Sequence, residues 1–468
     1  MEENKKFKQV LFGFKVCYMV YLLLAFNAFV NGASWMNIAS YVITILGAGM
    51  ILWMLFRYKR YKKGYNLWIL AGFAASYIIS AAAHFSYGGA ENVKGLIWLV
   101  FPLVLLYLSA FDMSGEEIRQ EMKWLSAIYI IYCTVVNIIS LSMVWWGRKY
   151  DYVDETGFVH AIGYRWQRLW GIYDDPNHGA TITVIALFML LYLFSCTRKW
   201  WQRIGLLLLF IIHYLYLALS DSRTGIIMLA AGLFLWHCLL AWVEKKRSVR
   251  PKHVLLLCIV GVLAAGTAFV GDVGVKAIYQ PMDAKIEAVM KAKNPATVKS
   301  PAGKTKTQKP DTRKKDLQHD YSNGRLEIWK NGLQIVEKSP VIGVGFRNIA
   351  GYAAEHFPEG YLVKNRGGVK YDSMHNLELD ILVGQGAIGG ILFLLLLINS
   401  SVILFKRMYQ VSGEYKTEPV FSTAACAALL AAGTFLSFIF YVNAPQNMCF
   451  WLLLGYAMRL CQIGAENK

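Results

Sequence analysis

The chain has 468 residues, of which 56% are hydrophobic, 14% aromatic and only 17% charged, and its mean hydropathy is +0.39. A soluble domain of this length needs more polar residues to cover its surface, so the composition excludes an ordinary soluble protein. A net charge of +18 would suggest nucleic acid in a soluble protein. Here much of the basic excess lies in short segments between apolar blocks, which is typical of cytoplasmic loops, and no nucleic-acid partner is predicted.

The apolar residues form blocks of roughly 17–25, the length that crosses a bilayer as a helix. We therefore predict an all-α polytopic membrane protein, embedded in a lipid bilayer, with about twelve transmembrane helices. The predicted spans are 9–30, 37–56, 67–84, 95–110, 124–146, 179–196, 204–220, 224–243, 254–271, 380–405, 420–443 and 446–462. These spans carry few polar residues, with Asn137, Asn399 and Gln446 as the exceptions.

Basic clusters in the short loops predict the orientation of the spans. Lys5, Lys6 and Lys8 precede the first span, and similar clusters follow the second, sixth, eighth and tenth. All of them fall on one side if the N-terminus is cytoplasmic, which places the C-terminus there too. The loop between the fourth and fifth spans, which carries Glu116 and Glu117, fits this pattern least well.

Three hydrophilic segments then face outward: 147–178, the turn Ser220–Gly225 and 272–376. The chain is thus divided into spans one to nine within 1–271, a large extracytoplasmic loop at 272–376, and spans ten to twelve within 377–468. A loop this long translocates regardless of its charge. Polar residues gather on the outer side, and we expect a functional site there.

The large loop divides into two parts of different composition. Residues 291–316 are rich in lysine and lack aromatic residues, which predicts a disordered linker; attraction of anionic glycans or headgroups is the alternative. In 323–340, Leu326, Trp329, Leu333 and Val336 recur at helical spacing before Pro340. This pattern predicts an amphipathic helix that lies on the bilayer or covers the spans.

Four outward clusters contain residues suited to chemistry. They are Arg165-x-x-Arg168-x-x-Gly171-x-x-x-Asp175-Pro176-Asn177-His178, Ser220-Asp221-Ser222-Arg223-Thr224-Gly225, Gly324-Arg325-x-x-x-Trp329 with Gly343-x-Gly345, and His375-Asn376 with Glu378 and Asp380. Each also has a structural interpretation. The arginines could extend to lipid headgroups, Asp175-Pro176-Asn177 could begin a helix, and Gly343 and Gly345 could form a turn.

Taken together, the clusters favour an anionic ligand. Guanidinium groups bind phosphate through paired donors, a histidine on the same side can accept a proton near neutral pH, and the apolar spans below can hold a lipid tail. This combination suggests a lipid-linked phosphate or pyrophosphate and an attacking hydroxyl. The sequence contains no HExxH motif, and its eight cysteines have no metal-ligand spacing, so neither a metal nor another cofactor is predicted.

Four segments resemble the O-antigen ligase and polymerase family in order and spacing. They are RLWGIYDDPNHGA, SDSRTG, GRLEIWKNGLQIVEKSPVIGVGFRN and HNLELDILVGQGAIGG, and the similarity covers roughly 165–405. The lysine-rich stretch 291–316 departs from the family pattern. The resemblance implies the all-helical fold of lipid-dependent glycosyltransferases, with the large loop over the site.

The resemblance further implies a glycosyltransferase of the bacterial cytoplasmic membrane. The donor would be an undecaprenyl-pyrophosphate-linked glycan, and the acceptor a glycan or glycolipid on the outer face, with other polysaccharide-assembly proteins as possible partners. Arg168, Arg223 and Arg325 match the arginines that bind the pyrophosphate. His375 matches the histidine that activates the acceptor hydroxyl as a general base, together with Arg223 and Arg325 in the catalytic set.

The remaining matched residues have supporting roles in this prediction. Asp175, Asn177 and Asn376 shape the site, and Glu378, one helical turn after His375, could orient it.

The sequence leaves several functions open. A polymerase joins repeat units, whereas a ligase moves a finished glycan to a terminal acceptor such as lipid A core, capsule, exopolysaccharide or a wall polymer. A flippase or polysaccharide exporter is the alternative from another class, and it should place ionisable residues or broken helices near mid-membrane. A non-catalytic scaffold would tolerate replacement of Arg168, Arg223 and His375.

Overall fold

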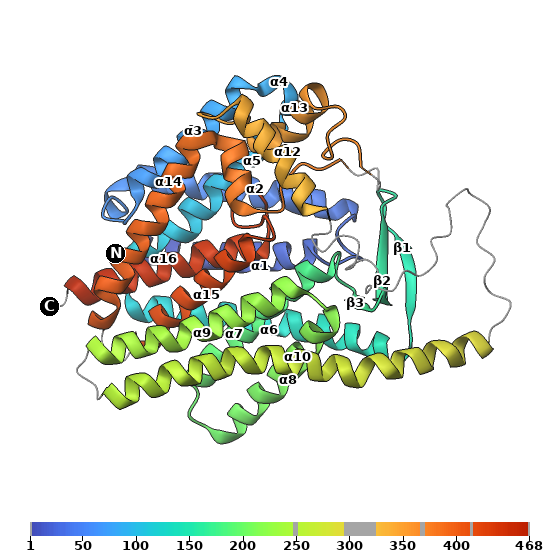
Figure 1. Cartoon of the computed structure of the whole chain (residues 1–468). Coiled ribbons are helices and arrows are strands. Elements are labelled where there is room, and N and C mark those ends of the chain that lie inside the picture. The colour runs from blue at the N-terminus through green and yellow to red at the C-terminus, as the bar shows by residue number, and fades with distance from the viewer. Residues whose placement is uncertain (1, 247–250, 294–323, 366–369, 412–414, 467–468) are drawn as a thin grey trace.

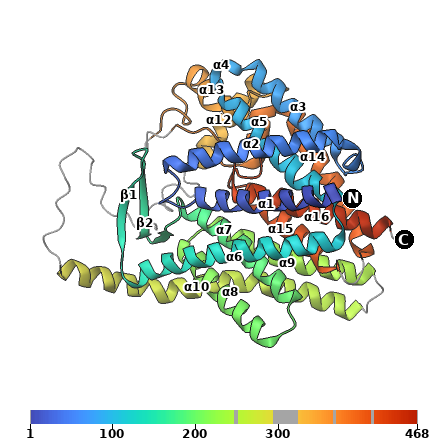
Figure 2. The ribbon, with the colours of Figure 1, turned by 180° about the vertical axis from the view of Figure 1, so that it is seen from behind.

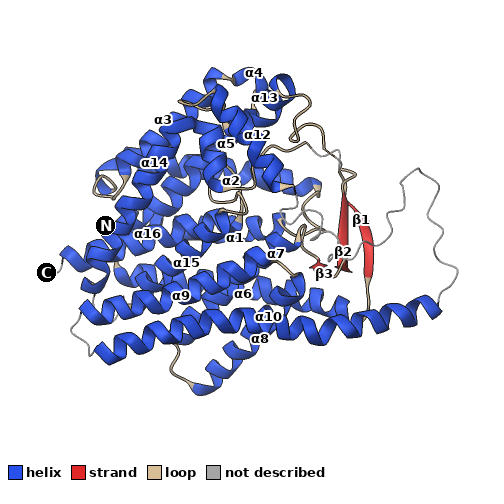
Figure 3. Cartoon of the chain, in the orientation of Figure 1, coloured by secondary structure: helices blue, strands red, loops and turns tan. Residues whose placement is uncertain are grey.

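The computed structural model describes residues 2–246, 251–293, 324–365, 370–411 and 415–466. Both chain termini lie at one end of the helices, and the only strands among these residues lie at the other end (Figures 1 and 3). This arrangement suits the predicted topology, in which the termini share one side of the membrane and the polar segments lie on the opposite side. The assignment of these two sides to cytoplasm and exterior stays a prediction.

The N-terminal half of the chain holds helices, short helical turns and a small sheet. Its elements are α1 (Glu2–Ala25), α2 (Ser34–Phe56), a 3-10 turn (Tyr58–Arg60), α3 (Leu67–Ala83), α4 (Phe85–Gly88), α5 (Glu91–Phe101), a π-helical segment (Pro102–Tyr107), a 3-10 segment (Leu108–Asp112), α6 (Gly115–Trp145), β1 (Lys149–Val153), β2 (Val159–Arg165), β3 (Arg168–Gly171), α7 (Pro176–Cys196) and α8 (Trp200–Ser220). The C-terminal half holds α9 (Arg223–Lys246), α10 (Pro251–Lys293), α12 (Arg325–Lys338), a 3-10 turn (Phe346–Asn348), α13 (Ile349–His356), α14 (Leu377–Arg407), a 3-10 turn (Met408–Gln410), α15 (Thr417–Gly433) and α16 (Pro445–Glu466).

A helix occupies most of each predicted span. In the described part of the chain, ten helices are long and apolar enough to cross a membrane. Helices α3 and α15, with 17 residues each, are shorter. The chain is therefore a multi-pass, predominantly helical membrane protein, whereas the number of twelve spans stays a prediction.

The outer segment 147–178 contains a three-stranded antiparallel sheet, which the all-α prediction missed. Strand β1 pairs with β2, and β2 with β3. The β1–β2 turn is closed by Asp154, whose Oδ1 accepts from the backbone N–H groups of Thr156 at 2.9 Å and Phe158 at 3.0 Å. Strands of four to seven residues give too short an alternating pattern to stand out beside apolar spans.

Helix α10 is 43 residues long and continues past the predicted span 254–271 to Lys293. The first part of the predicted loop 272–376 is therefore helical. Apart from its first three residues, the lysine-rich stretch 291–316 lies outside the described residues.

Helix α12 buries a face that includes Ile328, Asn331 and Ile335, while Leu326 and Leu333 of the expected apolar stripe are 63% and 50% exposed. These two exposed apolar side chains favour the first of the two expected positions, in which the helix lies on the bilayer.

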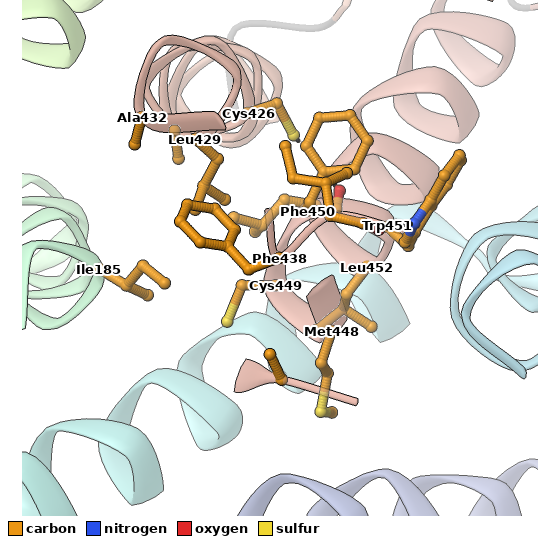
Figure 4. Close-up of a cluster of buried hydrophobic side chains, with 14 of the residues drawn as sticks. Ile185, Cys426, Leu429, Ala432, Phe438, Met448, Cys449, Phe450, Trp451 and Leu452 are labelled. Carbon is orange, nitrogen blue, oxygen red and sulfur yellow. Dashed lines mark hydrogen bonds between the residues drawn. The ribbon is translucent and has the colours of Figure 1, made fainter. Parts of the chain in front are cut away.

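The best-buried part of the bundle lies where α7, α15 and α16 meet. Figure 4 shows Ile185 of α7 facing Leu429 and Ala432 of α15, with Phe450 and Trp451 of α16 beside them. Alanines on α15 let the neighbouring helices approach closely. Such close packing stabilises helix pairs in a bilayer, where the hydrophobic effect does not drive helices together. This packing fixes α7, whose N-terminal residues belong to the candidate site.

Helix α14 is broken within the predicted span 380–405. Gly386 has φ 61° and ψ −158°, and the segment Pro340–Gly345 docks on the break. Val344 N donates to Val383 O and Gly345 N to Gly384 O, both at 2.8 Å, while Ala387 N donates to Pro340 O at 2.8 Å. The freed backbone groups of the helix are thus paired within the protein, as a membrane interior requires.

Charged residues pair between α1 and α6, and one of them, Lys15, lies within the predicted span 9–30, where few polar residues were expected. Helices α1 and α6 run next to each other (Figure 2). Fully buried Lys15 of α1 pairs with Glu121 of α6 at 2.9 Å, and Lys8 pairs with Glu117 at 2.9 Å. Glu117, one of the acidic residues in the loop that fitted the charge pattern least well, is therefore the partner of Lys8 near the N-terminus.

Candidate active site

The first predicted cluster folds into a junction between β3, α7 and α8. Arg168 begins β3, and its guanidinium donates to the Ser220 carbonyl at 2.9 Å and to Asn177 Oδ1 at 2.7 Å. Asn177 Oδ1 also accepts from Ser222 Oγ at 3.2 Å. Arg168 and Asn177 therefore tie together three segments that the sequence keeps up to 52 residues apart.

The Asp175-Pro176-Asn177 motif does begin a helix. Asp175 is the N-cap of α7, and its Oδ1 accepts from the backbone N–H of Asn177 at 2.7 Å; Pro176 takes the first helical position. His178, one position further, lies 3.2 Å through Nδ1 from Asp174 Oδ2 and packs edge-on against Phe26. The structural interpretation of this motif is correct, and it leaves a pairing role for Asp174 and His178 that sequence reasoning did not assign.

Arg223 and Arg325 occupy equivalent places in two different helices. Each is the first residue of its helix, α9 and α12 respectively, and helix N-termini favour anions. Burial lowers the pKa of Arg325, the positive charge of Arg223 lowers it further, and Asp175 raises it. Arg223 and Asp175 therefore each lie within electrostatic reach of Arg325. Two cations within reach of each other favour binding of an anion between them.

His375 lies in the turn that leads into α14, with φ 49°, a left-handed conformation that is uncommon outside glycine. Burial lowers its pKa first, and the charges of Arg325 and His178 lower it further, while Asp372 and Asp175 raise it. The fold thus brings His375 into electrostatic reach of Arg325 and of the α7 N-terminus. An imidazole with a lowered pKa is neutral at physiological pH and can accept a proton.

Hydrogen bonds to neighbouring elements hold the turn that carries His375. Buried Asp380 accepts from Met374 N at 2.7 Å and from Ser373 Oγ at 2.9 Å. Ser373 Oγ in turn accepts from His375 N at 3.1 Å. Trp329 of α12 donates from Nε1 to the Met374 carbonyl at 3.0 Å. The turn is therefore fixed both to α14 and to the helix that carries Arg325.

Asn376 and Glu378 differ in the hydrogen bonds that their side chains make. Asn376 is the N-cap of α14: its Oδ1 accepts from Leu379 N at 2.8 Å, and its Nδ2 donates to Thr434 O at 3.0 Å. Glu378 is exposed, and among the described residues it forms no hydrogen bond with His375. Asp380, and not Glu378, is hydrogen-bonded to the turn of His375. The sequence signal for this role is a carboxylate at the start of an apolar span, because such a group needs partners.

In the described part of the chain, no group of three or more His, Cys, Asp or Glu side chains could hold a metal ion. Arg223 and Arg325 are of a residue type suited to anion binding and His375 to proton acceptance, and Arg168 links β3, α7 and α8. Independence from metals and cofactors stays a prediction.

Comparison with known proteins bears directly on this region. The sequence model of the O-antigen ligase family matches residues 206–394. These residues are an O-antigen ligase domain. The domain contains Arg223, Arg325 and His375, whereas Arg168 and Asp175 precede it. The matched residues make up less than half of the chain.

A relative of known biological role supports the same family. The chain is 27% identical over 105 residues to the exopolysaccharide production protein ExoQ of Rhizobium meliloti (strain 1021). The similarity covers 22% of this chain and 23% of that protein. The match therefore spans less than a quarter of either chain.

Proposed function

We propose that this O-antigen ligase domain protein transfers a glycan from an undecaprenyl-pyrophosphate-linked donor to an acceptor hydroxyl on the outer face of the cytoplasmic membrane. The observation that supports the proposal is that Arg325 lies within electrostatic reach of both Arg223 and His375, at the end of the helices where the strands lie. Cations that bind a pyrophosphate and a neutral imidazole that accepts a proton are the two requirements of such a transfer.

The reaction follows from these positions. The His375 imidazole takes the proton from the acceptor hydroxyl, whose oxygen attacks the anomeric carbon of the donor glycan. The bond from this carbon to the pyrophosphate oxygen breaks, and the undecaprenyl pyrophosphate leaves with the electron pair. Arg223 and Arg325 stabilise the charge that develops on this leaving group. Arg168 and Asn177 hold the α7 N-terminus against α8, and Asp380 holds the turn of His375.

The product class is a surface polysaccharide. The name of the rhizobial relative, an exopolysaccharide production protein, favours an exopolysaccharide among the possible products. Capsule and lipopolysaccharide remain equivalent in chemistry, because each requires a hydroxyl acceptor and a lipid-linked donor.

One observation favours the alternative of a flippase or exporter: helix α14 is broken at Gly386. Broken helices in transporters expose backbone groups to substrate or ions. Here Pro340–Gly345 takes up backbone groups on both sides of the break, so the break supports the loop over the site rather than a path across the membrane.

The deciding experiment compares glycans from cells that carry His375→Ala with those from cells that carry His253→Ala. His253 is an exposed histidine at the start of α10, at the other end of the helices, and serves as the matched control at equal protein level. Accumulation of single repeat units on the lipid, with loss of long chains, identifies a polymerase. Accumulation of full-length chains on the lipid identifies a ligase. An unchanged glycan pattern for His375→Ala would contradict the proposed general base.

A further inference from the structure

A groove with a volume of about 560 Å³ lies between α12 and the segment 356–364. Its lining includes Lys330, Asn331 and Gln334 from the helix, and Phe357, Glu359 and Tyr361 from the segment. The volume is within the range of pockets that bind small ligands. None of these residues is part of the arginine and histidine site described above.

The chemistry of the lining differs from that of the arginine site. Two lysines and two glutamates, Lys330, Lys364, Glu327 and Glu359, balance each other in charge, and Lys364 pairs with Glu359 at 2.5 Å. A groove with no formal net charge from these four residues does not select a pyrophosphate. The available groups are aromatic rings and neutral amides.

Aromatic rings and amides together match a sugar. A pyranose ring has an apolar face of C–H groups, which packs on an aromatic ring, and a rim of hydroxyls, each both donor and acceptor. Asn331 Nδ2 donates to Gln334 Oε1 at 2.8 Å, and Asn331 Oδ1 accepts from Leu362 N at 3.2 Å. Within the described residues Gln334 makes no further hydrogen bond, so its amide N–H₂ group can donate to a hydroxyl.

Side-chain contacts link the groove to the candidate active site. Tyr361 stacks on Tyr371 with ring centroids 6.1 Å apart, and Tyr371 meets His375 edge-on at 5.8 Å. On the other wall, Asn331 lies on the helix that begins with Arg325 and whose Trp329 holds the His375 turn. A glycan bound in the groove at Tyr361 therefore lies two ring contacts from His375.

We infer that this groove binds a neutral oligosaccharide segment of the acceptor glycan, next to the sugar whose hydroxyl is activated by His375. The inference rests on the proposed function for the direction of the chain, but binding itself does not require catalysis. A second contact along the acceptor raises the effective concentration of its reactive end at the site. Loss of the groove should therefore shorten the product chains while His375 chemistry remains.

The test measures binding to the full chain in lipid nanodiscs by calorimetry, with two probes. The first is the delipidated oligosaccharide released from the surface polysaccharide of the producing cells, and the second is inorganic pyrophosphate. Phe357→Ala and Gln334→Ala should each weaken oligosaccharide binding about tenfold, a change of about 1.4 kcal/mol, and leave pyrophosphate binding unchanged. Lys338→Ala, on an exposed position of the same helix outside the groove, is the matched control and should change neither.

The reverse variant separates this inference from the proposed function. Arg325→Ala should lose pyrophosphate binding and keep oligosaccharide binding. Unchanged oligosaccharide affinity in both groove variants, or no binding of the oligosaccharide by the unmodified protein, would overturn the inference. Loss of pyrophosphate binding in Arg325→Ala would still support the proposed function in that case, so the two can fail independently.

Discussion

Asp380→Asn should slow catalysis, although Asp380 acts through the His375 turn and not on the substrate itself. Three donors point at this buried carboxylate: Met374 N at 2.7 Å, Ser373 Oγ at 2.9 Å, and Ser437 Oγ. Asparagine keeps the shape and one acceptor oxygen, but its N–H₂ group then faces groups that were donating. A hydrogen bond to a charged group contributes about 1.5–3 kcal/mol. If the misplaced His375 raises the activation free energy by about 2 kcal/mol, kcat should be about 30-fold lower.

The assay is transfer from the lipid-linked donor by the purified chain in nanodiscs, with kcat and KM measured separately across pH. The KM for the donor should stay unchanged, because Arg223 and Arg325 are intact. Burial lowers the pKa of His375, so a displaced imidazole should titrate at higher pH. The acidic limb of the rate profile should therefore move to higher pH. General destabilisation would not produce this shift.

Glu378→Gln is the matched control and tests the role expected for Glu378 from sequence. This exposed carboxylate makes no hydrogen bond to His375 within the described residues, so its variant should keep kcat within about twofold. A normal kcat in Asp380→Asn combined with a large loss in Glu378→Gln would refute the reasoning and restore Glu378 as the residue that orients His375.

Three further predictions concern pH, backbone fit and a buried ion pair. Because activity requires neutral His375, whose pKa lies below its usual value, kcat should fall only as the pH drops below about 6.5; Arg325→Gln removes a charge that lowers this pKa and should move the limb to higher pH in the rate profile of the residual activity. Gly343→Ala should lower thermal stability by about 2 kcal/mol or more, because φ is 66° and the added Cβ would lie 2.6 Å from the backbone of the α14 break; an unchanged Tm would contradict the docking of this loop. Arg119→Met should cost about 3 kcal/mol in denaturant unfolding, because it leaves Glu418, 1% exposed and paired at 2.8 Å, without its cation; the double variant with Glu418→Gln should recover much of this loss.

Loop charge and hydropathy predicted the helices well, because a span must satisfy its backbone within itself and must be apolar along its length. They could not predict the break in α14. Gly386 and Gly343 look like ordinary small residues in the sequence, and their conformations depend on each other across a contact between two segments. The strands in 147–178 were missed for a different reason, since runs of four to seven residues carry too short an alternating pattern to stand out beside apolar spans.

The sequence by itself determined the membrane class, the location of the helices and the types of residue at the site. Arg168, Arg223, Arg325 and His375 were identified because they gather in the predicted outward segments, suit an anionic substrate and match the family pattern. Only the tertiary structure decided which of these residues meet. Electrostatic coupling and a hydrogen-bonded turn depend on distances between α7, α9, α12 and α14, and no local pattern encodes such distances. For the same reason Asp380, buried by contacts from two other segments, emerged as the residue that positions His375 only once the chain was folded.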